Sequence, residues 1–202
     1  SGPDLAKELR IKNIDVLSTV PSLAHFLVNE DLGQLRLLIL GGEAVSKELA
    51  AGLISPKREV WNTYGPTEAT IIATATRLST EVPITIGTPI PGVSVAVLDD
   101  GGNLVPLGHV GELVISGLGL ARYLNPETDA AKFRAIDRLG WSRGYFTGDL
   151  VRPTENGLEF IGRVDEQVKV GGKRIELAEV ELVVASIQGV TTCATVATKT
   201  ES

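Results

Sequence analysis

The chain has 202 residues, 43% of them hydrophobic and 22% charged, which is typical of a globular protein rather than a disordered one. Its net charge of −6 disfavours nucleic-acid binding, which normally needs a basic surface. One cysteine, Cys193, excludes an internal disulfide, and two distant histidines give no zinc-ligand spacing. No apolar run approaches the roughly 18 residues of a membrane helix, so we expect a cytoplasmic protein without membrane contact.

Residues 1–82 alternate between helical and strand patterns. Apolar residues at helical spacing predict helices over 4–13 and 21–30, and Ser46 is a candidate N-cap for a third helix that ends at residue 54. Such alternation predicts an α/β fold, in which βα units build a largely parallel sheet. Short apolar runs predict its strands at 14–19, 35–42 and 58–64.

Residues 83–164 have a different pattern, in which glycine and proline separate short apolar runs. This texture predicts a small antiparallel β subdomain, interrupted by a helix over 126–133. Its expected strands are 93–99, 111–116 and 158–163.

Residues 165–202 predict a third unit. Two short strands, 167–170 and 173–176, are followed by an amphipathic helix over 177–188. We expect this unit to be the start of a small α+β C-terminal domain that is cut short.

The segment VWNTYGPTEAT, residues 60–70, is the first candidate site. It follows a predicted strand, and ligands of open α/β sheets bind in loops at the carboxyl ends of strands. Tyr64 could stack on a flat base, Thr67 could donate to a phosphate and Glu68 could hold a hard cation. The alternative is a simple turn at Gly65, with Tyr64 packed on the core and Glu68 in solvent. The residues alone leave both readings open.

The segment YFTGDL, residues 145–150, leaves a similar choice. Asp149 could accept hydrogen bonds from a ribose diol, or it could cap a turn. The charged stretch that begins at Arg163 favours a solvated hairpin and helix when it is considered alone.

Four segments in this order resemble motifs of the adenylate-forming superfamily, and within it the adenylation domains of nonribosomal peptide synthetases. The match extends from about residue 14 to the end of the chain. The four segments are NTYGPTEAT, GELVISGLGLARYL, YFTGDL and GRVDEQVKVGGKRIELAEVE.

The resemblance implies a role for each matching residue. Tyr64 would stack on the adenine of ATP or AMP, Thr67 would contact the α-phosphate and Glu68 would coordinate Mg²⁺, which makes Thr67 and Glu68 the catalytic pair. Asp149 would bind the ribose hydroxyls, with Arg163 nearby. Asp165 would be the hinge about which the C-terminal domain rotates. The remaining nucleotide-binding positions would be Gly42, Asn62 and Gly65.

The resemblance also implies an amino-acid side-chain pocket. Its positions here are small or apolar and carry no charge, so the expected substrate has an aliphatic or small side chain. The pocket residues are Ser18, Ile39, Gly41, Thr63, Ile71 and Ile72.

The implied function is that of part of an amino-acid adenylation domain. The parent would form aminoacyl-AMP from an amino acid and ATP and then load a phosphopantetheine thiol on a peptidyl carrier protein domain, expected in the same parent chain. The family's phosphate loop and catalytic lysine have no match here, so we expect the isolated chain to be inactive. Two alternatives remain, an acyl-CoA or aryl-acid ligase of the superfamily and a non-catalytic relative that binds nucleotide or carrier protein.

Overall fold

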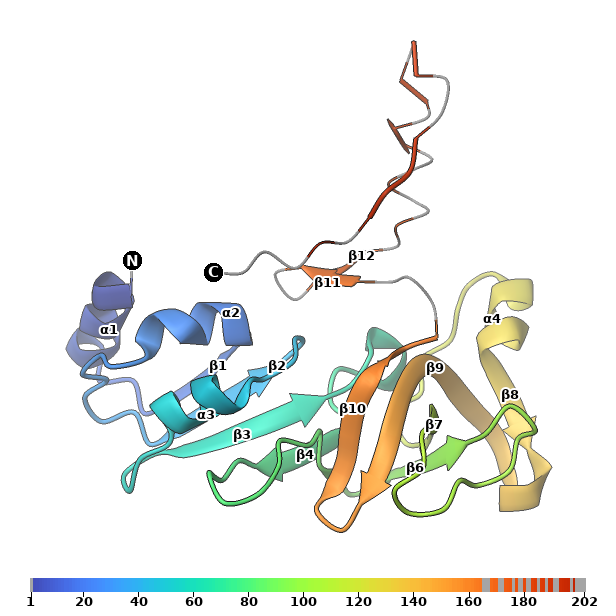
Figure 1. Ribbon diagram of the computed structural model, residues 1–202, viewed down its shortest axis with the longest axis horizontal. Helices are drawn as coiled ribbons and strands as arrows, with labels where there is room; N and C mark the ends of the chain where they lie inside the picture. Colours follow the sequence, from blue (N-terminus) through green and yellow to red (C-terminus); the bar gives the residue numbers. More distant parts are fainter. Residues whose placement is uncertain are drawn as a thin grey trace.

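The computed structural model describes residues 2–164, 168–170 and 173–175, and beyond these only positions 177, 180, 183, 184, 186, 187, 189, 190, 193–196 and 198. Two five-stranded sheets form the framework of this part of the protein, the first carrying the earlier strands and the second the later ones (Figure 1). None of the helices in the described residues is long and apolar enough to cross a membrane.

The first sheet has the strand order β1-β2-β3-β4-β5. Strands β1, β2 and β3 are parallel, and β4 and β5 add to β3 in antiparallel fashion. The expected parallel sheet is therefore confirmed, while β4 and β5 were not predicted. The sheet also continues beyond residue 82, where we expected the first subdomain to end. Its strands are β1 (Val16–Thr19), β2 (Leu37–Gly41), β3 (Glu59–Tyr64), β4 (Thr74–Arg77) and β5 (Thr88–Pro89).

The parallel strands and the helices share one hydrophobic core. Leu38, Leu40 and Val60 alternate with half-buried residues along β2 and β3 and are at most 1% exposed. Burying each such side chain fully contributes about 1.5–3 kcal/mol. The helices are α1 (Gly2–Ile11), α2 (Pro21–Ala24), the 3₁₀ turn η1 (His25–Leu27) and α3 (Lys47–Leu53).

The helix expected over residues 21–30 is shorter than predicted. Pro21 occupies the first turn of α2 as expected, but the α-helix ends at Ala24 and a 3₁₀ turn follows it. Val28 is already extended, and Asn29 has a left-handed φ of 66°. The apolar periodicity continues past the helix because Leu27 and Leu32 still face the core, at 1% and 2% exposed.

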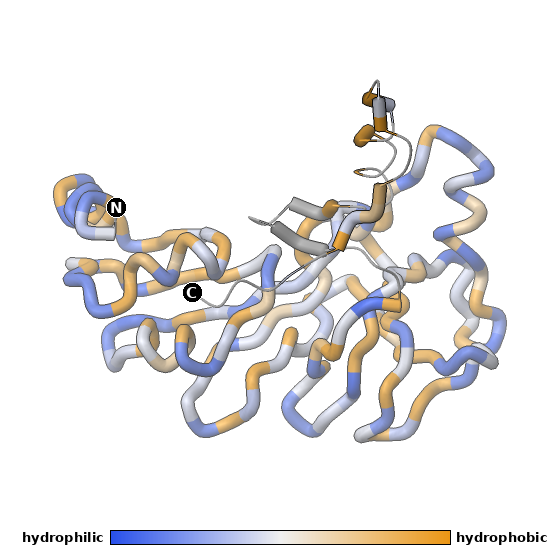
Figure 2. Tube along the Cα trace, turned by 45° about the horizontal axis from the view of Figure 1, so that its top comes forward, coloured by the Kyte–Doolittle hydropathy of each residue, from blue (hydrophilic) through white to orange (hydrophobic). Residues whose placement is uncertain are grey.

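The second sheet is antiparallel throughout and has the order β10-β9-β7-β6, with β8 paired to β9. The expected antiparallel β subdomain is thus confirmed. Figure 2 shows apolar stretches alternating with polar ones along the chain through both sheets. The elements are β6 (Val93–Leu98), β7 (Gly111–Gly117), α4 (Pro126–Lys132), β8 (Phe133–Ile136), the 3₁₀ turn η3 (Asp137–Leu139), β9 (Trp141–Thr154) and β10 (Gly157–Arg163).

Strand β9 is the main element that the sequence did not predict. It runs for 14 residues through Gly144, Gly148 and Pro153, residue types that favour turns. Gly148 has a left-handed φ of 72° and donates its N–H to the side chain of Glu112 at 2.9 Å, next to a register shift between β7 and β9. Gly148 therefore lies in a β-bulge, and the strand continues on either side of it.

The two sheets are joined by residues 84–88. The N–H of Ile86 donates to the carbonyl of Leu158 at 2.7 Å, and the N–H of Leu158 donates to the carbonyl of Gly87 at 3.0 Å. Gly87 has a φ of 82°, and a Cβ there would lie 2.1 Å from the carbonyl oxygen of Ala75. A hydrophobic cluster with members from both sheets lies at this junction: Tyr64, Ala69, Ala73, Ile86, Val97, Leu113, Ile115, Val151 and Leu158.

The C-terminal strand pair expected after residue 165 is confirmed. Strands β11 (Val168–Val170) and β12 (Lys173–Ile175) pair in antiparallel fashion. The expected hinge residue Asp165 lies outside the described residues, as does half of the helix expected over 177–188.

Helix α3 begins as the sequence predicts, and this gives a testable consequence. Ser46 precedes the helix in an extended conformation, and its Oγ accepts a hydrogen bond from the N–H of Leu49 at 3.1 Å. Loss of such an N-cap costs about 1 kcal/mol, which corresponds to roughly fivefold in an opening equilibrium. Ser46→Ala should therefore speed amide hydrogen exchange at Leu49 about fivefold, whereas Ser46→Asp should leave it near the wild-type rate. Equal rates in Ser46→Ala and the wild type would contradict the capping role.

Candidate functional site

A cavity of about 190 Å³ opens at the carboxyl end of β3, where the two sheets meet. Residues of β3 form one wall and residues of β10 form another. It is lined by Gly42, Glu43, Ala44, Val45, Asn62, Thr63, Tyr64, Gly65, Ile84, Thr85, Ile86, Glu159 and Phe160. The carboxyl end of a parallel strand is the place where open α/β sheets usually bind ligands.

The chain makes a sharp turn directly after β3. Gly65 permits it, because a Cβ at this position would lie 2.5 Å from the carbonyl oxygen of Ile71 and 2.7 Å from the amide nitrogen of Ala73. Pro66 then leads into the 3₁₀ turn η2 (Thr67–Ala69). The candidate residues Thr67 and Glu68 both lie on this short turn.

Two consecutive residues after η2 have left-handed backbones. Thr70 has a φ of 55° and Ile71 has a φ of 72°, both unusual for β-branched residues. Such conformations cost of order 1–3 kcal/mol each and are often found at functional sites. The loop is closed by the N–H of Ala73, which donates to the carbonyl of Tyr64 at 2.8 Å.

Tyr64, Asp149 and Arg163 form a buried polar cluster beside the cavity. The Tyr64 hydroxyl donates to one oxygen of the Asp149 carboxylate, and Arg163 donates to the other. Asp149 is 3% exposed and Tyr64 is 6% exposed. The cluster links β3 of the first sheet to β9 and β10 of the second.

The surroundings of Tyr64 keep its hydroxyl protonated. Burial raises the pKa of the Tyr64 hydroxyl well above its usual value near 10, and the neighbouring Asp149 charge raises it further. Tyr64 therefore remains a hydrogen-bond donor at neutral pH. The N–H of Asp149 donates to the Thr147 hydroxyl at 2.9 Å, and Arg163 also donates to the Thr147 carbonyl at 3.1 Å.

Asp149 lies within strand β9, so the turn-cap reading of this residue is wrong. Tyr64 packs in the core at the junction and also lines the cavity, so the packed reading and access to a ligand are compatible.

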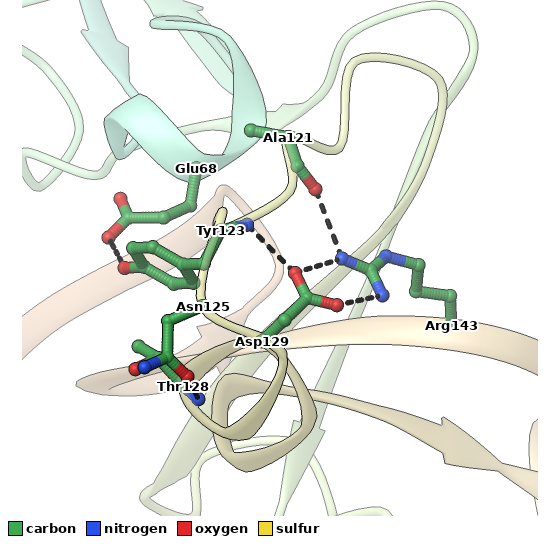
Figure 3. A network of polar contacts seen from close by, with 7 residues as sticks. All are labelled: Glu68, Ala121, Tyr123, Asn125, Thr128, Asp129 and Arg143. Carbon is green, nitrogen blue, oxygen red and sulfur yellow. Dashed lines mark hydrogen bonds and ion pairs between the residues drawn. The ribbon is translucent and has the colours of Figure 1, made fainter.

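Glu68 is half-buried and bonded, whereas the simple-turn reading of residues 60–70 left its side chain in solvent. One oxygen of its carboxylate accepts a hydrogen bond from the hydroxyl of Tyr123 (Figure 3). Its backbone carbonyl accepts from the N–H of Ala121 at 2.8 Å. No group of three or more His, Cys, Asp or Glu side chains that could hold a metal ion is found among the described residues.

A buried hydrogen bond joins Asn62 to Thr85, and both residues line the cavity. It is 4% exposed, and its Nδ2 donates to the carbonyl of Thr85 at 2.7 Å. Gly41 lies beside Thr63 on the neighbouring strand, and a Cβ at Gly41 would lie 2.5 Å from the Thr63 hydroxyl. Thr63 in turn donates to the Leu40 carbonyl at 2.9 Å.

Four residues of the expected substrate pocket lie on one face of the first sheet. Ser18 is in register with Ile39, and Gly41 is in register with Thr63. Ile39 and Gly41 are two residues apart on β2, so they point to the same face of the sheet. Their partners Ser18 and Thr63 share that face, which is the one opposite to the side chain of Leu40. Ile71 is 74% exposed after η2, and Ile72 is half-buried next to it.

The cavity brings together only part of the predicted site. Its walls include the predicted residues Gly42, Asn62, Thr63, Tyr64 and Gly65. Asp149 does not line the cavity but is bonded to Tyr64, which does, and Arg163 is bonded to Asp149. Thr67 and Glu68 lie on the turn that follows the lining residue Gly65.

Several functional candidates were missed by the sequence analysis. Glu43, Ala44 and Val45 follow β2 directly, so their position after a parallel strand could have indicated them. Residues 84–86, together with Glu159 and Phe160, come from the sheet junction and carry no local signal. Tyr123 also had none, because its partner Glu68 is 55 residues away in the sequence.

Comparison with known proteins agrees with this architecture. The family model for AMP-binding enzymes matches residues 3–124. One of the linear gramicidin synthase proteins of Brevibacillus parabrevis is 46% identical over 186 residues, which is 89% of this chain and 4% of that protein. PA1221, a nonribosomal peptide synthetase protein containing adenylation and PCP domains, has a TM-score of 0.87 and 32% identity over 96% of this chain and 42% of that chain. AB3403, a four-domain nonribosomal peptide synthetase bound to AMP and glycine, has a TM-score of 0.76 and 37% identity over 100% of this chain and 16% of that chain.

These relatives are much longer than the chain, which spans 4% of the gramicidin synthase protein and 42% of PA1221. The resemblance carried by the four motifs is confirmed, as is the expected partial adenylate-forming fold. Because the family model matches more than half of the chain, the chain belongs to the AMP-binding enzyme family.

Proposed function

We propose that the chain is part of an amino-acid adenylation domain, and that the protein containing it forms aminoacyl-AMP and pyrophosphate from an amino acid and ATP. The observation that carries this proposal is the cavity at the end of β3, which Asn62, Thr63, Tyr64 and Gly65 line in a member of the AMP-binding enzyme family. The relatives described above, one of them bound to AMP and glycine, support the same assignment.

In this reaction an oxygen of the substrate carboxylate attacks the α-phosphorus of ATP. A new P–O bond forms, and the bond to the pyrophosphate leaving group breaks. The protein contributes mainly by holding the reactants in line and by stabilising charge on the phosphoryl oxygens. The Thr67 hydroxyl, on the turn after the cavity, is the donor that we assign to the α-phosphate.

Glu68 fits a Mg²⁺ site of the kind that nucleotides complete. Mg²⁺ is commonly held by one or two carboxylates together with substrate phosphates and water. A single carboxylate on η2, without a cluster of further acidic ligands in the described residues, agrees with that donor set. When bound, the ion would neutralise charge on the phosphate oxygens.

The base and ribose are assigned to the other side of the cavity. The Tyr64 ring, which lines the cavity, would stack on the adenine, with Gly42, Asn62 and Gly65 around it. Asp149 would accept hydrogen bonds from the ribose hydroxyls, through the lone pairs that its bonds to Tyr64 and Arg163 do not use. Since Asp149 is 3% exposed, this contact requires a shift of the Tyr64 ring or of Arg163.

The substrate side chain is assigned to the sheet face that carries Ser18, Ile39, Gly41 and Thr63, with Ile71 and Ile72 beside it. These groups offer no charge, so an aliphatic or small amino acid is the expected substrate. We further assign the second half-reaction, transfer to the phosphopantetheine thiol of a peptidyl carrier domain, because PA1221 contains adenylation and PCP domains. Asp165 is kept as the proposed hinge for that step.

ATP–pyrophosphate exchange by the intact protein tests the proposed function. One or a few small or aliphatic amino acids should stimulate exchange, and matched acids without the α-amine should not. Exchange with amine-free acids alone would instead assign an acyl or aryl-acid ligase. An absence of exchange with every acid, despite nucleotide binding, would assign a non-catalytic relative.

The metal assignment predicts a large effect of Glu68→Gln. The substitution keeps the size of the side chain but removes the charge that attracts Mg²⁺, and metal stabilisation of a transition state is worth several kcal/mol. We expect the exchange rate to fall by roughly 10²-fold or more. Glu155→Gln, at an exposed turn between β9 and β10, serves as the control and should retain the wild-type rate. Equal rates for the two variants would remove Glu68 from the site.

The stacking assignment predicts different results for two substitutions at Tyr64. Tyr64→Leu removes the ring, and loss of stacking on one base costs about 1–3 kcal/mol, or roughly 5- to 100-fold in affinity. Tyr64→Phe keeps the ring and should bind AMP within a few-fold of the wild type. Isothermal titration with AMP in the absence of Mg²⁺ measures both. If the two variants lose affinity equally, the hydroxyl bonded to Asp149 matters rather than the ring.

A further inference from the structure

Glu68 lies on an element that cannot orient its side chain alone. Turn η2 has three residues, and a single 3₁₀ turn fixes backbone atoms but leaves a long carboxylate side chain free to rotate. The two left-handed residues that follow it, Thr70 and Ile71, separate it from the regular structure of β4. The orientation of the Glu68 carboxylate must therefore come from contacts outside this turn.

Residues 118–125, which join β7 to α4, supply those contacts (Figure 3). The N–H of Ala121 donates to the Glu68 carbonyl at 2.8 Å, and the Thr70 hydroxyl donates to the carbonyl of Gly119. The Tyr123 hydroxyl donates to Oε1 of Glu68. The first contact holds the backbone of the turn, the second holds the side chain of the residue after it, and the third acts on the carboxylate itself.

The segment is in turn held by an ion pair between α4 and β9. Arg143 donates to both oxygens of the Asp129 carboxylate, at 2.8 and 2.9 Å. Oδ1 of Asp129 also accepts the N–H of Tyr123 at 2.8 Å, and Arg143 donates to the Ala121 carbonyl at 3.1 Å. One carboxylate and one guanidinium thus fix both ends of the Ala121–Tyr123 backbone.

Packing and charge both favour this arrangement. The guanidinium of Arg143 lies over the Phe133 ring at 3.9 Å, and the Tyr123 ring meets Phe133 edge-on with centroids 6.0 Å apart. The hydrogen bonds from Arg143 lower the pKa of the Asp129 carboxyl, so the pair is ionised at neutral pH.

We propose that Tyr123 is a positioning residue for the metal ligand Glu68, and that the Asp129–Arg143 pair holds Tyr123 in place for this task. The inference rests on the proposed function, in which Glu68 binds Mg²⁺. A carboxylate has two oxygens with about four lone-pair positions, so one hydrogen bond from a neutral phenol restricts its rotation without blocking coordination. Outer partners of this kind typically account for about 10- to 100-fold in metal affinity.

Metal binding in the intact protein, with α,β-methylene-ATP bound, tests the inference through the Mn²⁺ dissociation constant measured by electron paramagnetic resonance. Tyr123→Phe keeps the ring against Phe133 and removes only the hydroxyl. We expect Mn²⁺ to bind about 10-fold more weakly, with unchanged metal-free affinity for the nucleotide. Arg143→Lys, which cannot make the two-pronged contact with Asp129, should weaken Mn²⁺ binding in the same direction. Its control is Arg36→Lys, at an exposed pair with Asp15 on the first sheet, which should leave Mn²⁺ binding unchanged.

A double-mutant cycle separates the two levels of the proposal. Glu68→Gln should weaken Mn²⁺ binding by itself, and adding Tyr123→Phe should then have no further effect, because the hydroxyl acts only through the carboxylate. Wild-type Mn²⁺ affinity in Tyr123→Phe, alongside weakened binding in Glu68→Gln, would overturn the positioning role and leave the proposed metal site intact. Unchanged Mn²⁺ binding in Glu68→Gln would overturn both.

Discussion

The buried contact of Tyr64 and Arg163 with Asp149 is the constraint on which the arrangement of the two sheets depends. A carboxylate that is 3% exposed is costly to bury unless its charge and its lone pairs are satisfied. Here one partner comes from the last residue of β3 and the other from the last residue of β10. The ion pair of Arg163 with Asp149 lies within the second sheet, whereas the hydrogen bond from Tyr64 joins the two sheets. A hydrogen bond to a charged group is worth about 1.5–3 kcal/mol, so the Tyr64 contact favours the observed orientation of the sheets.

The cavity is a consequence of that orientation. Tyr64 must remain in the core to reach Asp149, and this places Asn62 and Thr63 along one wall. Residues 84–86 form another part of the lining because Ile86 pairs with Leu158 of the second sheet. Glu68 is held differently, by a loop and an ion pair near the surface. The proposed nucleotide pocket is thus built into the core, while the proposed metal ligand is supported from outside it.

The sequence predicts the three parallel strands of the first sheet because they are short apolar runs between polar segments, but it does not predict β4 and β5. It also predicts the start of α3, since Ser46 is a residue type that favours the N-cap position. It fails for β9, where Gly144, Gly148 and Pro153 are accommodated by pairing with neighbouring strands and by a bulge. Local residue patterns do not include those partners.

The candidate site shows the same division. Gly65, Thr67 and Glu68 are recognisable because one loop contains them all. The pairing of Tyr64 with Asp149 joins residues 85 apart, and that of Tyr123 with Glu68 joins residues 55 apart. Each of these hydrogen bonds depends on how two strands or loops come together, so only the folded chain reveals it.

The position of the cavity between the sheets links ligand binding to mechanical integrity. A ligand in the proposed pocket would touch β3 on one side and β10 on the other, so its binding would favour the state in which the sheets remain together. By mass action, each tenfold rise of the ligand concentration above its dissociation constant adds about 1.4 kcal/mol to the free energy of separating the sheets. The protein with its ligand bound would thus resist local opening and proteases better than the protein without it.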